Sequence, residues 1–356
     1  MAKLPDYAVS TGEHLAEWME DEGINAAEMA RRLGVTPKHV SELLGGVAPL
    51  SHRLAIALER VTGIPARIWS QLESGYRADL ARFAEEESLK AQYERAKGFP
   101  LAYLRQHRFI TAPARDHVET VRQLLRLLGV ANLDAFAVTW GKGNVAYRKS
   151  AVGRDDALAL ATWLALAERH HERSGDRPAF TRSRLDALIP GLRSLTVSPD
   201  VGRALGEVIA RLRGVGVILC VVPAVPGLGI YGATRWLHGR PVVQLSLRGK
   251  TDDQLWFTLF HELGHVLLHG DRALYLWGED TAAEAEADAY AADLLIPPAY
   301  ADRVPTTRDL AAVTELAAEL GIAPSIVLGR AQRLTGDYGW GHGLRRPVEW
   351  EIGTGA

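Results

Sequence analysis

The sequence has almost no cysteine, no long hydrophobic run and no excess of charge of one sign. Cys220 is the only cysteine among 356 residues, which excludes an intrachain disulfide and a zinc site built from several thiolates. The most apolar stretch, 215–230, is too short to cross a bilayer and is interrupted by Pro223 and Pro226. Lysine and arginine number 41 against 43 aspartates and glutamates, so bulk charge does not direct the chain to nucleic acid or acidic lipid.

Signals for export and repetition are also missing. The first ten residues lack the basic region and apolar core of a secretory signal, and there is no internal repeat or low-complexity tract. We therefore expect a cytoplasmic protein without a membrane partner, in line with its single cysteine. The hydrophobic fraction of 47% is ordinary for a folded protein, and the length favours two or three domains over one.

Residues 12–72 carry apolar side chains at helical spacing in short blocks, with turn signals between the blocks and no alternating strand pattern. Gly34 suits the left-handed backbone at the exit of one helix. Thr36 suits the cap of the next helix, and Pro37 suits its first position. This order predicts a helix-turn-helix unit.

The same segment resembles the lambda-repressor-like (XRE) helix-turn-helix family, in particular its HigA-type antitoxin branch. The resemblance implies that the helix starting at Pro37 enters the major groove of double-stranded DNA and that the protein binds as a homodimer. A helical bundle that only docks protein partners is the alternative. The residues expected to contact DNA are Thr36, Lys38, His39, Ser41 and Glu42, with Asn25 and Arg31 near phosphates.

Charge predicts that this DNA affinity is modest for a single copy. Residues 1–80 contain eight lysines or arginines and eleven aspartates or glutamates, whereas domains that neutralise many phosphates are usually basic. We expect the helix-turn-helix domain to span 1–76. A helical linker and central helical region without recognisable chemistry should follow over 77–214, and a further domain over 215–356.

The most specific pattern lies in a helix that is apolar on most sides. Nine of the fourteen positions after Gln254 are bulky and apolar, and Gly270 ends the run, which predicts a buried helix. Within it, residues 261–265 read HELGH. His261 and His265 are four apart, so both can bind one cation at about 2 Å each. Two histidines and a glutamate in a core are costly unless satisfied, which favours zinc over hydrogen-bonded core histidines.

Glu262 stands beside the open coordination position of such an ion. There it can take a proton from water and hand it to a leaving amine, which is the chemistry of a metallopeptidase. His269 shares the helix face but lies roughly 12 Å from His261 along a straight helix, so it cannot bind the same ion. The third ligand must therefore come from a later element.

Two carboxylates compete for that position. Residues 281–284 read TAAE, which fits a capping box and would occupy Glu284 with its own backbone. Glu286 is then the free carboxylate. Both residues flank the apolar face of the expected helix, so periodicity alone does not choose between them.

The HELGH run, followed by EADAYAADLLIP at 286–297, resembles the ImmA/IrrE metallopeptidase family, over about 216–334. The resemblance implies a gluzincin-like site that binds zinc, with Asp288 replacing the asparagine of a Glu-Ala-Asn-like triplet. It assigns zinc to His261, His265 and Glu286, and the general base to Glu262. An oxyanion donor should also exist, and Tyr231, Arg235, His238 and His269 remain alternatives for it.

These features predict a mainly α protein with a small β-sheet (α+β). It would combine a lambda-repressor-like helical domain with a gluzincin-like metallopeptidase domain. Branched residues predict strands at 216–222, 229–233 and 242–247. The resemblance to fused bacterial and phage regulators implies a transcription regulator or antitoxin-like repressor whose peptidase cleaves a regulatory protein, either itself or a partner repressor or toxin.

Two other hypotheses remain open. In one, the chain binds DNA but its zinc domain is a non-proteolytic sensor or structural module. In the other, the chain is a peptidase whose N-terminal helices only recruit a protein substrate.

Overall fold

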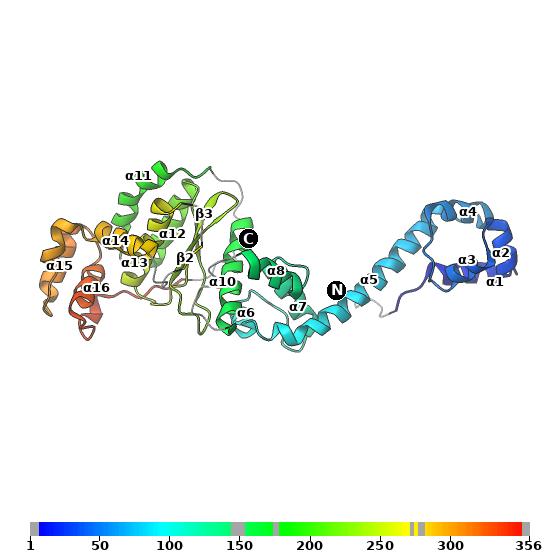
Figure 1. Ribbon diagram of the computed structural model, residues 1–356, viewed down its shortest axis with the longest axis horizontal. Helices are drawn as coiled ribbons and strands as arrows, with labels where there is room; N and C mark the ends of the chain where they lie inside the picture. The colour runs from blue at the N-terminus through cyan, green and yellow to red at the C-terminus, as the bar shows by residue number, and fades with distance from the viewer. Residues whose placement is uncertain (1–6, 144–153, 174–177, 271–273, 277–281, 351–356) are drawn as a thin grey trace. The chain divides into compact units, whose positions relative to one another are not determined.

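The computed structural model describes residues 7–143, 154–173, 178–270, 274–276 and 282–350. The chain divides into two compact units, Met1–Ala91 and Gln92–Ala356, and the division falls within the long helix α5, Ala66–Ala96 (Figure 1). The described residues are mainly helical with one small sheet, which confirms the expected fold class. No helix among them is long and apolar enough to span a bilayer.

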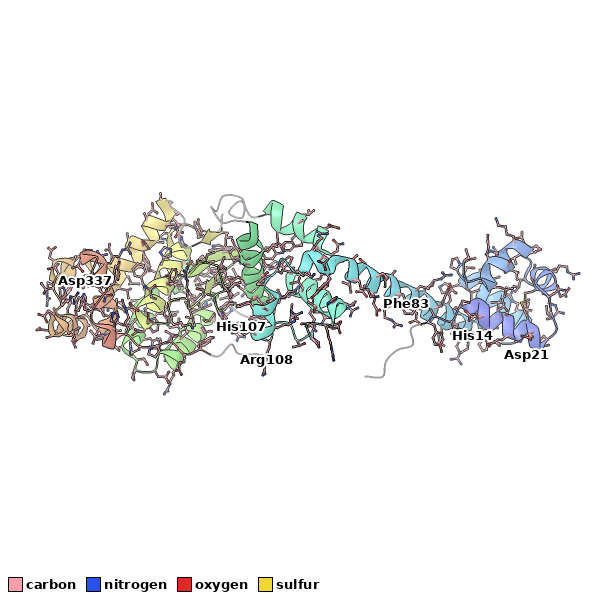
Figure 2. All side chains as sticks on the ribbon, turned by 90° about the horizontal axis from the view of Figure 1, so that it is seen from below. His14, Asp21, Phe83, His107, Arg108 and Asp337 are labelled. Carbon is pink, nitrogen blue, oxygen red and sulfur yellow. The ribbon has the colours of Figure 1, made fainter. Side chains whose placement is uncertain are left out.

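The first unit is a helical bundle around one apolar core. Its core includes Leu15, Met29, Val40, Leu58 and Trp69, which are almost completely buried. Polar residues such as Asp21, at the end of α1, are exposed around it (Figure 2). The helices before α5 are α1 (Thr11–Asp21), α2 (Ala26–Leu33), α3 (Pro37–Leu44) and α4 (His52–Thr62).

The turn between α2 and α3 forms as its residues predict. Gly34 adopts a left-handed backbone with φ of 65°, which glycine tolerates best. The Thr36 side chain caps α3 by accepting a hydrogen bond from the His39 amide at 3.2 Å, and Pro37 occupies the first turn. Helices α2 and α3 are therefore joined by a short turn, as in a helix-turn-helix.

The second unit begins with helices that precede a four-stranded sheet. The helices are α6 (Leu101–Gln106), α7 (His117–Leu128), α8 (Leu133–Gly143), α10 (Arg154–Arg173), α11 (Arg182–Arg193) and α12 (Val201–Gly214), with a 3-10 turn η1 (Ser194–Val197). The strands are β1 (Ile218–Val221), β2 (Gly232–Leu237), β3 (Arg240–Leu245) and β4 (Tyr275–Leu276). After the sheet's third strand come α13 (Asp252–Leu268), α14 (Ala282–Leu295), η2 (Pro298–Arg303), α15 (Leu310–Leu320), α16 (Pro324–Thr335) and η3 (His342–Leu344).

The sheet has the strand order β1-β3-β2-β4, with β1 parallel to β3 and the other pairs antiparallel. The expected strand at 229–233 instead begins at Gly232 and extends to Leu237. The reason is the tight turn that follows, where His238 and Gly239 have φ of 51° and 74°. Two consecutive positive φ values are typical of a two-residue hairpin turn, which sets the register of β2 against β3.

Different helices cover the two faces of the sheet. On one face, α10 packs on β1 and β3; the Trp163 indole donates to the Val222 carbonyl at 3.2 Å, and the Gln244 amide donates to the Trp163 carbonyl at 2.7 Å. On the other face, α13 packs on β2 and β3. Helix α10 thus supports the sheet from the side opposite α13, whereas α11 and α12 share the apolar core of α13.

The N-terminus of α13 is tied to the C-terminal segment. Asp252 is fully buried and accepts hydrogen bonds from the Arg346 guanidinium and the Ser325 hydroxyl, both at 2.8 Å. Asp253 accepts one from Arg345 Nε at 2.8 Å. The first turn of the helix, where negative charge is favourable, is therefore held by two arginines.

Candidate metal centre

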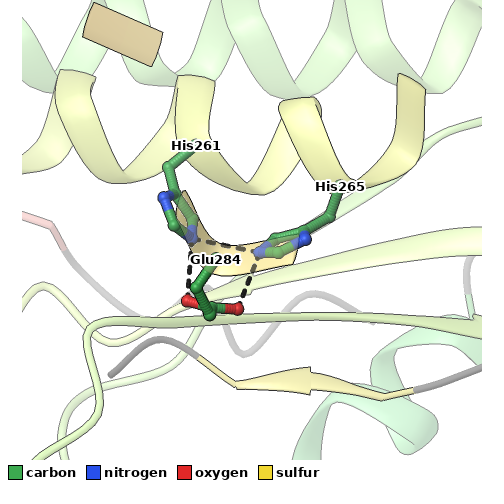
Figure 3. A group of neighbouring side chains, drawn as sticks. All are labelled: His261, His265 and Glu284. Atoms are coloured by element: carbon green, nitrogen blue, oxygen red, sulfur yellow. Dashed lines mark hydrogen bonds and ion pairs between the residues drawn. The ribbon is translucent and has the colours of Figure 1, made fainter. Parts of the chain in front are cut away.

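The two histidines of the HELGH run face each other on consecutive turns of α13. His261 and His265 are 1% and 0% exposed, and their Nε2 atoms lie 3.1 Å apart. Both side chains project from the same side of α13 (Figure 3). A four-residue spacing on a helix produces this arrangement.

Glu284 of α14 completes a cluster with the two histidines. Its Oε2 lies 3.3 Å from His261 Nε2, and its Oε1 lies 3.0 Å from His265 Nε2 (Figure 3). Helix α14 comes this close because Gly264 faces it without a side chain. A Cβ at Gly264 would lie 3.0 Å from Tyr290 Cδ1 and 3.4 Å from Ala287 Cα.

The carboxylate beside the histidines differs from the one expected. Glu286 is mostly exposed, and its Oε2 lies 2.9 Å from His269 Nε2, outside the cluster. An α-helix turns about 100° per residue, so Glu284 and Asp288 share the face toward α13, whereas Glu286 points roughly to the opposite side. Thr281, the expected partner of Glu284 in a capping box, lies outside the described residues.

The cluster has the dimensions of a metal site. Among the described residues, His261, His265 and Glu284 offer three ligand atoms within 4.8 Å of one another. Zinc binds such atoms at about 2.0–2.1 Å in tetrahedral geometry, which sets neighbouring ligand atoms roughly 3.3 Å apart. The observed separations of 3.0 to 3.3 Å match this spacing, so the residues fit a zinc ion.

Outer hydrogen bonds orient both imidazoles. His261 Nδ1 lies 2.9 Å from Asp288 Oδ1, so Nδ1 donates to the carboxylate. His265 Nδ1 lies 3.0 Å from His269 Nδ1, and His269 Nε2 lies 2.9 Å from Glu286 Oε2. Because a carboxylate only accepts, the proton of neutral His269 is on Nε2 and His265 donates from Nδ1. Both Nε2 atoms therefore face the cluster, where they can bind a metal ion once they carry no proton.

The acidic neighbours also shift the pKa values of the cluster. Burial lowers the pKa of His261, but hydrogen bonds to Asp288 and Glu284 outweigh it and raise the pKa to about 9. Burial raises the pKa of Glu284, yet its hydrogen bonds to the two histidines hold this pKa at about 2. The neighbouring carboxylates thus favour positive charge at this place, in the form of a proton on His261 when no metal ion is bound. Binding of a metal ion would release that proton.

Glu262 faces β2 instead of α14. Its Oε2 accepts a 2.6 Å hydrogen bond from the Thr234 hydroxyl, while its buried Oε1 has no hydrogen-bond partner among the described residues. Burial raises the pKa of Glu262 to about 8, against the opposing effects of His261 and Thr234. A carboxyl with this pKa exchanges a proton near neutral pH, which is a property of general acid–base catalysts.

The four alternatives for an oxyanion donor lie in different places. Arg235 points to the opposite face of the sheet from Thr234 and pairs with Glu168 at 2.6 Å. His238 occupies the hairpin turn, the Tyr231 ring lies under Arg248, and His269 is held by His265 and Glu286.

Sequence reasoning missed Tyr275, whose ring stacks on His265 at a centroid distance of 4.5 Å. A two-residue strand leaves no periodic signal that would have identified it. Tyr275 reaches His265 because β4 pairs with β2, with Thr234 opposite Tyr275.

The residues expected to contact DNA lie in the first unit. Lys38, Ser41 and Arg31 are exposed, and His39 and Glu42 are half-buried. Asn25 and Thr36 act as N-caps, with their side chains accepting backbone amides. Polar side chains thus cover the outer surface of α3, while Val40 and Leu43 point into the core.

Gly232→Ala tests the approach of Glu262 to β2. A Cβ at this position would lie 2.3 Å from Glu262 Oε1, so we expect a loss of about 1–3 kcal/mol in the free energy of unfolding, measured by denaturant titration. Gly206→Ala is the matched control, because a Cβ there meets nothing within 4 Å. Equal stability of the two variants would contradict this placement of Glu262.

Comparison with known families agrees with part of this site. No curated protein matches the chain, and the family match does not extend to residues 1–213. The matched segment contains the three strands β1, β2 and β3 and all the residues of the His261–His265–Glu284 cluster. A metallopeptidase family implies a metal ion, which this cluster fits. Residues 214–332 match the Peptidase_M78 family, the IrrE N-terminal-like domain.

Proposed function

We propose that the second unit is a zinc-dependent peptidase and that the first unit binds operator DNA. The chain would then be a transcription regulator or antitoxin-like repressor whose peptidase cleaves a regulatory protein, either itself or a partner. One observation carries the peptidase assignment: a buried His261–His265–Glu284 cluster with the orphaned Glu262 Oε1 next to it on the same helix.

Within this site each residue has a separate task. A bound zinc ion supplies a Lewis acid for water and for the scissile carbonyl. His261, His265 and Glu284 would hold the ion, and Asp288 and His269 orient the two imidazoles through Nδ1. Glu262 would accept the proton of water at Oε1 and deliver it to the leaving amine nitrogen, while Thr234 holds Oε2 in place.

The pair Glu284→Gln and Glu286→Gln tests which carboxylate binds the metal. We expect Glu284→Gln to weaken zinc affinity at least about 100-fold, because it removes an anionic ligand from the cluster. Glu286→Gln should lower zinc affinity about tenfold or less, since Glu286 acts only through His269. Competition with a chromophoric chelator measures both values, and the opposite order would return the assignment to Glu286.

Glu262→Gln separates a peptidase from a non-proteolytic sensor. The amide cannot accept a proton, so cleavage of a co-expressed repressor should fall by at least about 100-fold, while zinc content measured by atomic absorption stays at the wild-type level. Wild-type protein loaded with zinc that cuts neither itself nor any repressor encoded beside it would instead favour the sensor hypothesis. Unchanged cleavage by the variant would remove Glu262 from its proposed role.

The structural support for DNA binding is the exposed face of α3. The side chain of Lys38 is 85% exposed and forms a long ion pair of 3.7 Å with Glu42, so its charge is available to a phosphate or a base. Lys38 follows the N-cap and proline that begin the helix, and N-terminal residues of the recognition helix contact base edges in this motif. Since the unit has few basic residues, binding as a homodimer to two half-sites would supply the necessary affinity.

Lys38→Ala tests this surface. We expect binding to the region upstream of the protein's own gene to weaken about tenfold in a gel-shift assay at low salt. Lys90→Ala is the control, because Lys90 is an exposed lysine of the same unit on α5 that pairs with Glu87. Equal effects of the two substitutions, or no shift with wild-type protein, would favour the hypothesis that these helices recruit a protein.

A further inference from the structure

A second candidate binding site lies next to α13, away from the histidine cluster. It is a cavity of about 180 Å³ between α13, α14, α16 and the segment after α16. None of His261, His265 and Glu284 lines it. The residues that line it come from four separate parts of the chain, all within the second unit.

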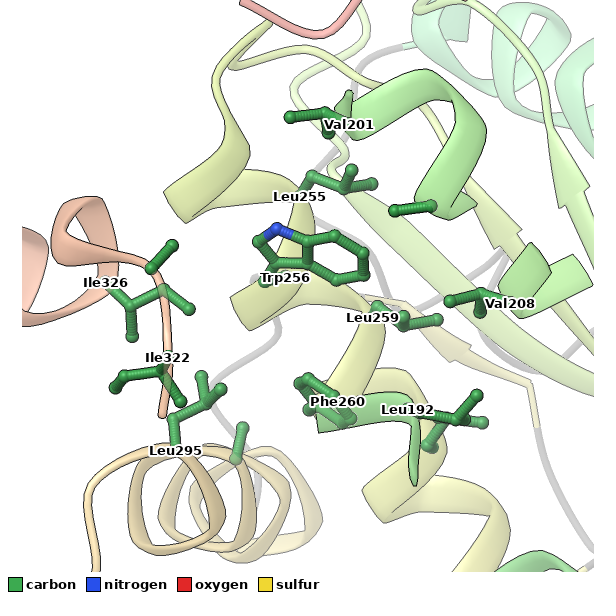
Figure 4. Close-up of a cluster of buried hydrophobic side chains, with 14 of the residues drawn as sticks. Leu192, Val201, Val208, Leu255, Trp256, Leu259, Phe260, Leu295, Ile322 and Ile326 are labelled. Carbon is green, nitrogen blue, oxygen red and sulfur yellow. The ribbon is translucent and has the colours of Figure 1, made fainter. Parts of the chain in front are cut away.

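One wall of this cavity is apolar. Phe257 of α13, Leu295 and Ile296 of α14 and Ile326 of α16 line it. Leu295 and Ile326 belong to the core around Trp256 (Figure 4), so this wall is continuous with the core. An apolar cavity of about 150 Å³ is large enough to hold a benzene ring, so the space suits a ligand with one aromatic ring or a branched chain of similar size.

The other wall carries uncompensated positive charge. Arg330 lines the cavity, and it has no ion pair or hydrogen bond with the residues that the structure describes. Arg333 also lines the cavity and makes one weak contact, 3.4 Å from Asp288. By comparison, Arg303 and Arg308, also in the C-terminal part of the chain, each pair with a carboxylate. A half-buried arginine that lacks such a carboxylate among the described residues favours an anion.

A buried acceptor adds a third feature. Asp253 is 6% exposed and lines the cavity. Its Oδ2 accepts a hydrogen bond from Arg345, but its buried Oδ1 has no partner in the part of the chain that the structure describes. Buried carboxylate oxygens are normally satisfied, so a donor on a bound molecule would complete this site.

We propose that this cavity binds a small molecule with an apolar body and a carboxylate. The apolar body packs on Phe257 and Ile326, and the carboxylate pairs with Arg330. An amino group on the same molecule, as in an apolar amino acid, would donate to Asp253 Oδ1. The site stands independently of the proposed peptidase activity, because none of its features involves a metal.

The test is a calorimetric titration of the full chain with three related probes. They are 3-phenylpropionate, L-phenylalanine and the uncharged 3-phenylpropionamide. We expect at least one carboxylate to bind with a Kd near or below about 1 mM and the amide to bind at least about tenfold more weakly. Tighter binding of phenylalanine than of phenylpropionate would identify an amino acid as the ligand, and the reverse order would identify a simple acid.

Two variants locate the binding site. Arg330→Gln should weaken binding of the preferred carboxylate probe at least about tenfold. Arg308→Gln removes an exposed arginine outside the cavity and should leave the Kd of that probe unchanged. Ala292→Leu narrows the cavity without changing its charge and should weaken the binding of the carboxylate and amide probes equally. Circular dichroism confirms that each variant is folded.

Three results would overturn the proposal. The first is the absence of saturable binding of either carboxylate up to about 10 mM. The second is equal affinity for acid and amide. The third is a folded Arg330→Gln variant with the affinity of the wild type.

Discussion

The burial of two imidazoles and two carboxylates in one core is the constraint on which the second unit depends. Each ionised group costs several kcal/mol to desolvate unless partners compensate it, so the surroundings must supply those partners at short range. Gly264 lets α14 approach and bring Glu284 to both histidines, and Gly232 lets β2 approach Glu262. One glycine allows close contact on the α14 side of α13, and the other allows it on the β2 side. The polar residues at the centre of α13 therefore find partners on both sides, although most of the helix is apolar.

The rest of the unit keeps α13 from moving relative to these partners. Its first turn is fixed by the pairs of Asp252 with Arg346 and of Asp253 with Arg345, which also fasten the C-terminal segment. The sheet on which α13 packs is in turn backed by α10 through main-chain carbonyls of buried residues. A site that must hold ligand atoms near 3 Å apart is thereby supported at both the end and the side of its central helix, as pre-organised sites require.

Patterns in the sequence predicted those features that are determined by residues close together in the chain. The spacing of His261 and His265, the turn at Gly34 and the caps of α3 are all set within about one helical turn, and the structure has the turn, the caps and the facing histidines as expected. The third metal ligand could not be predicted in this way, because the choice between Glu284 and Glu286 depends on which face of α14 packs on α13. Only the tertiary contact between Gly264 and Ala287 decides this face. Tyr275 and the cavity beside Arg330 depend on distant segments as well, so no spacing could indicate them.

The same helix faces link the histidine cluster to the cavity. On α13, His261 lies one turn after Phe257 and two turns after Asp253, and on α14 Asp288 lies one turn before Ala292; residues four apart share a face. The residues of α13 and α14 that line the cavity thus lie on the same helix faces as His261 and Asp288, one turn or more away. Arg333 lines the cavity and touches Asp288 at 3.4 Å. The carboxylate that orients His261 at 2.9 Å therefore has a cavity-lining arginine as its other charged neighbour.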